Sequence, residues 1–277
     1  MDRAKFGLKP IELQVFHGFI FLRFHPGPQP DIATVLAPFA ADFAAYGLAK
    51  VLPVALPSWG NDLPVNWKSV RDVDNEGYHV AMAHPGLQDL YGRTYRDLAL
   101  EGGLSMSIGY FGDVPGRSWS VRHYNATSQD RPDLPPHLRR AWTYYGLWPN
   151  MVFAFTPESV QFYHDIPQSP GLTRTTGRLY RHAHEDRATR AARYLAQRID
   201  RATSAEDQQL SIWSNESMKS TAFEGFHLSD LEYGVRRHHD HLRTVLPIMT
   251  LDSPPPEAEL AIRNREMLGQ KAKQAQI

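Results

Sequence analysis

Two histidines and a glutamate lie close together in the segment 66–86, which reads NWKSVRDVDNEGYHVAMAHPG. Glu76, His79 and His84 all fall within this segment. Neutral imidazole and carboxylate groups together are suitable ligands for iron, zinc or manganese. The segment therefore predicts a site for a transition metal.

The spacing of the two histidines limits how they could bind one ion. His79 and His84 are five residues apart, which places them about 140° apart around an ideal helix. They converge only if the helix ends between them. Pro85 predicts that ending, because the residue before a proline is pushed out of the α region. Glu76 precedes His79 by three residues, so it can coordinate or hydrogen-bond beside it.

A second acidic pair, Glu206-Asp207, follows a predicted amphipathic helix over residues 185–201. Thr203 and Glu206 have the spacing of a capping box, which predicts that another helix begins there. Asp207 would then lie in a first helical turn, where the helix dipole favours the ionised carboxylate.

The segment around the histidines resembles the signature of a known family. N-W-K followed by acid-x-Tyr-His-x4-His-Pro-Gly is similar to the mononuclear-iron motif of Rieske-type ring-hydroxylating oxygenases, in the catalytic domain of the α (large) subunit. The family often has Glu-Asn where this chain has Arg71-Asp72, which changes a hydrogen-bonding position but not the ligands. The matching residues are Asn66, Trp67, Lys68, Glu76, Tyr78, His79, His84, Pro85, Gly86 and Leu87.

The resemblance implies a facial triad of His79, His84 and Asp207 around Fe(II), with open positions for O₂. It implies that Glu76 links this site to the electron donor. It also implies an α+β fold of the helix-grip (START/Bet v1-like) type, a curved antiparallel sheet around a long helix. In the family, electrons from a reductase or ferredoxin pass through the Rieske cluster of a neighbouring subunit in a homotrimer.

The sequence contains no cysteine. A Rieske [2Fe–2S] cluster needs two cysteines and two histidines, so this chain cannot bind one. We therefore expect the cluster on a Rieske domain that the chain lacks. The expected organisation is a residual Rieske-domain hairpin and linker (1–30), a mononuclear-iron catalytic domain (31–253) and a charged, mobile C-terminal tail (254–277).

The composition excludes some partners and locations. Thirty basic and thirty acidic residues cancel, whereas binding to nucleic acid or an anionic membrane favours a strongly basic face. No apolar run approaches the ~20 residues that span a bilayer, and the N-terminus has no signal-peptide core. We expect a cytoplasmic protein that binds neither nucleic acid nor membranes.

Local patterns predict the order of the elements. The β-rich segment 5–24 turns at His17-Gly18, and 25–30 is a linker. After the first metal-binding histidines we expect a polar, Gly-rich region through residue 117, with turns at Gly102-Gly103 and at 113–116. The other expected elements are helices at 31–49 and 230–246 and strands at 50–56, 118–126, 141–166 and 174–184.

Aromatic residues of the β-rich centre could line a substrate pocket above the iron. An aromatic substrate would stack on such rings, and a trimethylammonium group would bind them by cation–π contacts. We favour hydroxylation of an aromatic or related small substrate, because no carboxylate is obviously placed to pair with a cation. Oxidative N-demethylation of a quaternary amine is the alternative. The expected pocket residues are Tyr110, Trp148, Asn150 and Phe155.

Other interpretations compete with this one. Glu76–His79 and Glu224–His227 are two Glu-x-x-His motifs, as in di-iron bundles, but the β-rich centre does not fit a bundle. A zinc hydrolase also uses two histidines and a carboxylate, without explaining the wider motif. A truncated, inactive binding or assembly module is the non-enzyme alternative. The histidines of 238–241 are expected on a solvated polar helix face.

Overall fold

An antiparallel sheet forms the centre of the computed structural model, which describes residues 7–8, 10–24, 30–54 and 59–274. Its strand order is β3-β10-β9-β8-β7-β6-β5, and β4 also pairs with β10. The strands are β3 (Leu52–Pro53), β4 (Trp59–Leu63), β5 (Arg96–Ala99), β6 (Ser105–Tyr110), β7 (Ala141–Leu147), β8 (Met151–Thr156), β9 (Ser159–Ser169) and β10 (Leu172–Arg181).

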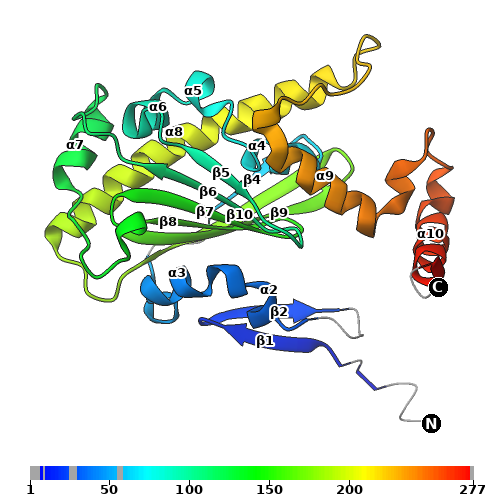
Figure 1. Ribbon diagram of the computed structural model, residues 1–277, viewed down its shortest axis with the longest axis horizontal. Coiled ribbons are helices and arrows are strands. Elements are labelled where there is room, and N and C mark those ends of the chain that lie inside the picture. Colours follow the sequence, from blue (N-terminus) through cyan, green and yellow to red (C-terminus); the bar gives the residue numbers. More distant parts are fainter. Residues whose placement is uncertain (1–6, 9, 25–29, 55–58, 275–277) are drawn as a thin grey trace.

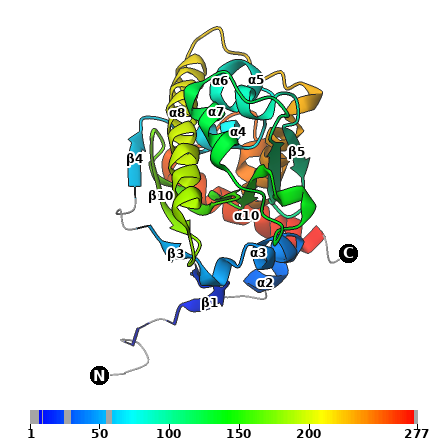
Figure 2. The ribbon, with the colours of Figure 1, turned by 90° about the vertical axis from the view of Figure 1, so that its left-hand side faces the viewer.

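One long helix, α8 (Arg187–Ser217), crosses a face of this sheet beside α4 (Trp67–Asp74), α6 (Pro85–Tyr91) and α7 (Trp119–Thr127) (Figure 1, Figure 2). The Asp186 side chain caps α8 by accepting from the Thr189 backbone N–H at 2.7 Å. The sheet and the helix confirm the expected helix-grip fold. The expected helix start at Thr203 is wrong, because α8 continues through that position without a glycine or proline to interrupt it.

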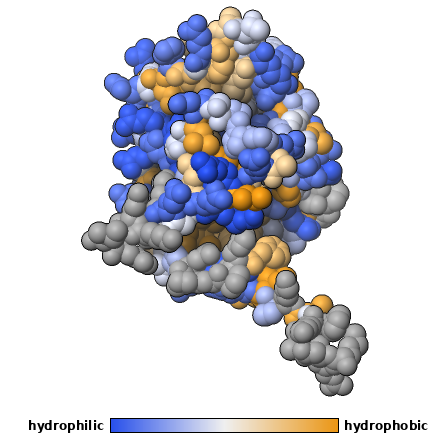
Figure 3. All heavy atoms as spheres, turned by 90° about the vertical axis from the view of Figure 1, so that its right-hand side faces the viewer, coloured by the Kyte–Doolittle hydropathy of each residue, from blue (hydrophilic) through white to orange (hydrophobic). Residues whose placement is uncertain are grey.

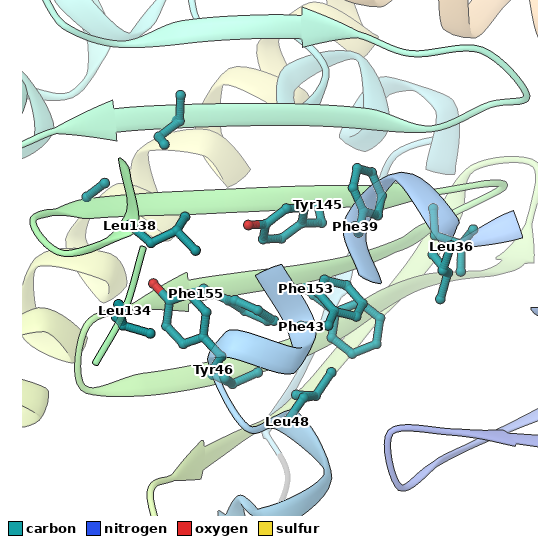
Figure 4. Packing of buried hydrophobic residues seen from close by; sticks show 14 of the residues in the cluster. Leu36, Phe39, Phe43, Tyr46, Leu48, Leu134, Leu138, Tyr145, Phe153 and Phe155 are labelled. Carbon is teal, nitrogen blue, oxygen red and sulfur yellow. The ribbon is translucent and has the colours of Figure 1, made fainter. Parts of the chain in front are cut away.

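The alternation of side chains along the strands separates two cores. On β7, Trp142 packs with Leu195 and Ile199 of α8. Tyr145 points to the opposite face, where it packs against Phe39 and other buried side chains (Figure 4). The α8 side of the sheet is therefore left for the site, while the other side is filled by aromatic and aliphatic groups.

The segment 31–49 covers this second face as four short turns instead of one helix. They are α2 (Ile32–Val35), η1 (Ala37–Phe39), α3 (Ala40–Ala45) and η2 (Leu48–Lys50). Pro38 lies in the first turn of η1, where a proline cannot donate the backbone hydrogen bond that would continue α2.

The N-terminal strands β1 (Glu12–Phe16) and β2 (Phe19–Arg23) form the expected hairpin. His17 (φ 49°) and Gly18 (φ 85°) form its turn, as a tight hairpin requires. Phe19 packs edge-on against Phe153 of the sheet, at 5.0 Å between ring centroids. Most of the linker predicted for 25–30 and the last two residues of the strand predicted for 50–56 lie outside the described residues.

One prediction for the region 87–126 is wrong. Residues 118–126 form the helix α7 instead of a strand, with Ser118 capping it and Val121 and Tyr124 buried on one face. The region expected to be polar and Gly-rich contains β5 and β6, for which no strand was predicted from the sequence. The predicted turn between these strands is confirmed by positive φ angles at Gly102 and Gly103.

The C-terminal region contains more helix than the sequence indicated. It contains η4 (Asp230–Glu232), α9 (Tyr233–Val245), η5 (Pro247–Thr250), η6 (Glu257–Glu259) and α10 (Leu260–Gln274), so the expected tail is largely helical. The face seen from the α10 side is mainly hydrophilic, with separate hydrophobic spots (Figure 3). Among the described residues, no helix is long and apolar enough to cross a membrane.

The histidines of α9 do not share the predicted solvated face. His238 is 7% exposed and lies against the rings of Trp148 and Trp67. His239 contacts a carboxylate oxygen of Asp72 on α4 at 2.8 Å. These contacts fasten α9 to α4, so the histidines have a packing role there.

Candidate metal centre

A short helical turn holds the two candidate histidines at its ends. Helix α4 ends before Glu76, and a separate turn, α5 (Val80–Ala83), begins after His79. His84 follows this turn with a non-helical backbone (φ −117°, ψ 82°), and Pro85 starts α6. The predicted break before Pro85 is confirmed. The prediction that His79 ends the first helix is wrong, since that helix stops earlier.

The two imidazoles and Asp207 converge on one point. The Nε2 atoms of His79 and His84 are 3.0 Å apart. Asp207 Oδ1, on α8, lies 2.8 Å from His84 Nε2 and 3.5 Å from His79 Nε2. One ligand atom from each residue therefore falls within 4.8 Å of the others. The fold brings these residues together across a long sequence separation, and metal ligation by them stays a prediction.

Two further carboxylates orient the imidazoles from outside. His79 Nδ1 contacts Glu76 Oε1, and His84 Nδ1 contacts Glu206 Oε2 at 2.8 Å. With each Nδ1–H donating outward, both Nε2 lone pairs face the common point, as metal-binding histidines require. The sequence did not reveal this role of Glu206, although the residue adjoins Asp207.

The donor set fits a divalent iron ion. Asp207 Oδ1 is a buried oxygen without a hydrogen-bond partner in the described part of the chain, and two nitrogens and one carboxylate oxygen are the donors of a facial triad. Burial raises the pKa of Asp207, but the adjacent His79 and His84 outweigh it and hold that pKa below its usual value. An ionised carboxylate is therefore available to a cation.

The same carboxylates act on the histidines. Burial lowers the pKa of His79, but Asp207 and Glu76 more than offset it and raise that pKa to about 10. A negative environment that attracts a proton to Nε2 also attracts a divalent cation, so metal and protons compete for this position.

Close packing fixes the loop that carries Glu76 and His79. The Gly77 N–H donates to Asp97 Oδ2 at 2.7 Å. A Cβ at Gly77 would lie 1.9 Å from the Tyr95 ring, so no other residue fits without movement.

The alternative motif at 224–227 is exposed and irregular, which does not fit a second Glu-x-x-His helix of a di-iron site.

A cavity of about 580 Å³ adjoins the candidate ligands, between α8 and the sheet. Tyr144 of β7, Tyr163 of β9 and Trp59 of β4 supply aromatic surface to it. It also contains acidic side chains from α4, β9 and α8, which are Asp74, Asp165 and Asp200.

None of the four expected pocket residues lines this cavity. Tyr110 and Phe155 point to the opposite face of the sheet and belong to the core there. Trp148 packs against α9, with its ring 5.3 Å from that of His238. The Asn150 side chain donates to the backbone carbonyl of Asp165. Tyr110 and Phe155 occupy strand positions that face away from α8, and Trp148 and Asn150 lie in the turn between β7 and β8.

Burial perturbs the acids of the cavity. It raises the pKa of Asp74 to about 7, although Arg71 lies 2.9 Å away and acts against this. It raises the pKa of Asp200 to about 6, and the Asp207 charge adds to the effect. Burial also raises the pKa of Asp165. These groups lie in a desolvated region where an unpaired negative charge is costly.

A helix-grip domain with two histidines and an aspartate beside a deep cavity has the architecture of the catalytic domain of a Rieske-type non-haem iron oxygenase. Residues 52–248 match the family "Ring hydroxylating alpha subunit (catalytic domain)". The chain therefore belongs to this family, and the resemblance noted in its sequence is confirmed.

The relatives include the carnitine monooxygenase oxygenase subunit of Acinetobacter baumannii, 24% identical over 169 residues, which are 57% of this chain and 39% of the relative. The carnitine monooxygenase oxygenase subunit of Acinetobacter pittii is 23% identical, and the match again covers 57% of this chain and 39% of the relative. The matched region thus spans about two fifths of the length of these relatives.

Solved structures share the fold. The quaternary ammonium Rieske monooxygenase CntA superposes with a TM-score of 0.66 at 17% identity, over 87% of this chain and 63% of that chain. Naphthalene 1,2-dioxygenase from Rhodococcus sp. gives a TM-score of 0.59 at 12% identity, over 88% and 67%. The architecture is therefore common to structures named for different substrates.

Proposed function

We propose that this chain binds Fe(II) through His79, His84 and Asp207 and uses O₂ to oxygenate a small organic molecule in the adjoining cavity. The convergence of these three side chains at the wall of the cavity carries the proposal. Bound iron would supply open coordination positions for O₂.

The residues of the chain would divide the remaining work. Glu76 and Glu206 hold the two imidazoles in the orientation that exposes Nε2. Leu63, Val152 and Leu179 give the cavity apolar walls, which exclude water from the substrate. Tyr144 and Tyr163 offer ring surface that can orient the substrate.

Electrons would come from outside these residues. No cysteine is present to ligate a Rieske cluster, so we assign the cluster to another domain. A reductase or ferredoxin would supply that cluster with electrons. The Glu76 side chain is 11% exposed, and its neighbour Tyr78 is 56% exposed. This proximity to the surface supports Glu76 as the link to a neighbouring subunit of a homotrimer. We place the reaction in the cytoplasm.

We also propose the division into a hairpin and linker (1–30), a catalytic domain (31–253) and a tail (254–277), with the hairpin belonging to a cluster-bearing domain. The outward face of the hairpin supports this, because it is apolar and exposed. It consists of Leu13, Val15, Ile20 and Leu22.

An exposed face predicts a substitution effect that depends on the partner domain. In this chain, Ile20→Ser should change the free energy of unfolding by less than about 0.5 kcal/mol, because the side chain is already in water. In a chain extended by a Rieske domain, it should cost about 1–2 kcal/mol through lost burial. Urea unfolding of both forms measures this, and equal effects would contradict the assignment.

For the substrate, we propose a quaternary amine in place of the aromatic ring favoured by the sequence. Two observations support this choice. The relatives are named carnitine monooxygenase oxygenase subunits, and Asp74, Asp165 and Asp200 line the cavity, supplying the carboxylates that the sequence did not reveal.

Peroxide provides a test that needs no electron donor. Iron-loaded chain with hydrogen peroxide should convert a small amount of bound quaternary amine into the tertiary amine that remains after one N-substituent leaves as an aldehyde, and mass spectrometry detects that amine. Iron-loaded Glu216→Ala, an exposed change on α8, should behave like the unchanged chain, whereas His84→Ala should give no product. Intact iron binding without oxidised product from either a quaternary amine or benzoate would favour an inactive binding module.

A further inference from the structure

We propose that Asp165 and Asp200, on facing walls of the cavity, are specificity-determining residues that hold the cationic head of the substrate. This inference deepens the proposed function and rests on it for the identity of the reaction. It assigns the recognition of the positive charge to two named side chains outside the metal site.

The charge balance of the cavity indicates a cationic occupant. Five carboxylates and only two guanidinium groups line it. A divalent metal at the three ligands would leave one formal negative charge in excess. One organic cation would neutralise this excess, whereas with a neutral aromatic substrate one of these acids would have to take up a proton instead.

Asp165 provides the observation that is independent of charge counting. Its side chain is fully buried on β9. Oδ1 accepts a hydrogen bond from Thr175 Oγ1 at 2.6 Å, whereas Oδ2 has no partner among the described residues. The Asp165 side chain lines the cavity, and a buried carboxylate without a full set of donors is stabilised by a nearby positive charge, which a quaternary ammonium supplies without donating a hydrogen bond.

Burial raises the pKa of Asp165 and the nearby positive charge of Arg71 lowers it, but Arg71 is already paired with another acid. Its guanidinium donates to Asp74 Oδ2 at 2.9 Å and to Asn75 Oδ1 at 3.1 Å, so its ion pair is with Asp74. No ion pair joins Asp165 or Asp200 to a basic side chain in the part of the chain that is described. These two acids are therefore the ones available to an incoming cation.

Asp200 stands at a suitable distance from the metal ligands. It precedes Asp207 by seven residues on α8, which is two helical turns and about 10.5 Å along the axis, on nearly the same face. That interval leaves room for one ammonium head between the reacting position and the Asp200 carboxylate. Tyr144 and Tyr163 line the same space, and aromatic faces also attract quaternary ammonium groups.

Isothermal titration of the iron-loaded chain with choline and with its uncharged carbon isostere, 3,3-dimethylbutan-1-ol, tests the proposal. The two probes have the same shape, so their ratio of dissociation constants reports recognition of charge. We expect choline to bind at least about tenfold more tightly, a difference of about 1.4 kcal/mol. Asp200→Asn and Asp165→Asn should each reduce this ratio severalfold.

Asp62→Asn is the matched control. Asp62 lies on β4 between two residues that line the cavity, but its own side chain points outward and is 54% exposed beside Arg174. This variant removes the same charge and should keep the full preference for choline. Iron content, measured on every sample, should be unchanged in all three variants, because none of these residues contacts the metal ligands.

Three results would overturn the inference. Equal affinity for the two probes in the unchanged chain, or no binding of either, would exclude charge recognition without needing any variant to fold. A preference for choline that survives both substitutions would assign it to other groups. If iron binding and peroxide-driven oxidation are normal in these cases, the proposed function still holds and only the assignment of charge recognition fails. A chain that binds no iron would contradict the proposed function itself.

Discussion

Asp207→Ala is expected to abolish iron binding by a chain that otherwise retains one iron ion per molecule. The substitution removes the only anionic donor of the candidate triad and leaves two neutral imidazoles, which hold Fe(II) weakly. It also removes the carboxylate that lies 2.8 Å from His84 Nε2 and 3.5 Å from His79 Nε2. His79→Ala should abolish binding in the same way. Metal analysis after loading with Fe(II) and desalting measures the loss.

Glu216→Ala is a suitable control for Asp207→Ala, because Glu216 lies on the same helix and is exposed. This control should retain full iron occupancy. Circular dichroism should show that both variants keep the helix content of the unchanged chain. Zinc at full occupancy in the purified protein, unaltered by Asp207→Ala, would contradict the assignment of the triad.

The sequence was most informative where a local pattern determines a local structure. His17-Gly18 indicated a hairpin turn, and Pro85 indicated a chain break that allows His79 and His84 to meet. In both cases the conformational limits of a few adjacent residues decide the outcome. The resemblance contributed the third ligand, since no local rule connects Asp207 with His84.

The long helix shows why a local signal can mislead. Thr203 and Glu206 have capping-box spacing, yet both lie in the interior of α8. The same spacing occurs by chance in helices, and packing of Leu195, Ala196 and Ile199 under α7 and the sheet favours an uninterrupted helix. Asp207 is ionised because of its histidine neighbours, and the helix-dipole explanation is wrong.

The pocket could not be derived because it depends on which face of each strand meets α8. On β7, Tyr144 lines the cavity and Tyr145 lies in the opposite core. A shift of one residue exchanges the two sets completely. The buried acids were missed for a related reason. Asp165 and Asp200 are far apart in sequence, and they line one cavity because α8 lies across the sheet that contains β9.

Glu76→Gln is expected to keep iron at saturating Fe(II) but to lower turnover about 10–100-fold when a Rieske donor is supplied, as is typical for residues that support a metal ligand. Glu76 uses both carboxylate oxygens. Oε1 contacts His79 Nδ1, while Oε2 accepts from the backbone N–H groups of Tyr78 and His79 at 2.6 and 3.2 Å. A glutamine has only one acceptor oxygen. Its amide N–H₂ would therefore face either the His79 Nδ1–H or the two backbone N–H groups, and it can accept from neither.

Glu206→Gln separates support of a ligand from the proposed electron link. Glu206 contacts His84 Nδ1 through one oxygen at 2.8 Å, so a glutamine can rotate its carbonyl oxygen into that place. We therefore expect a smaller loss of turnover than for Glu76→Gln. Iron content and single-turnover rates of both variants give the comparison. Loss of iron from Glu76→Gln would show that Glu76 is a ligand. Equal single-turnover rates in the two variants would show that Glu76 only holds the imidazole and does not link the site to the electron donor.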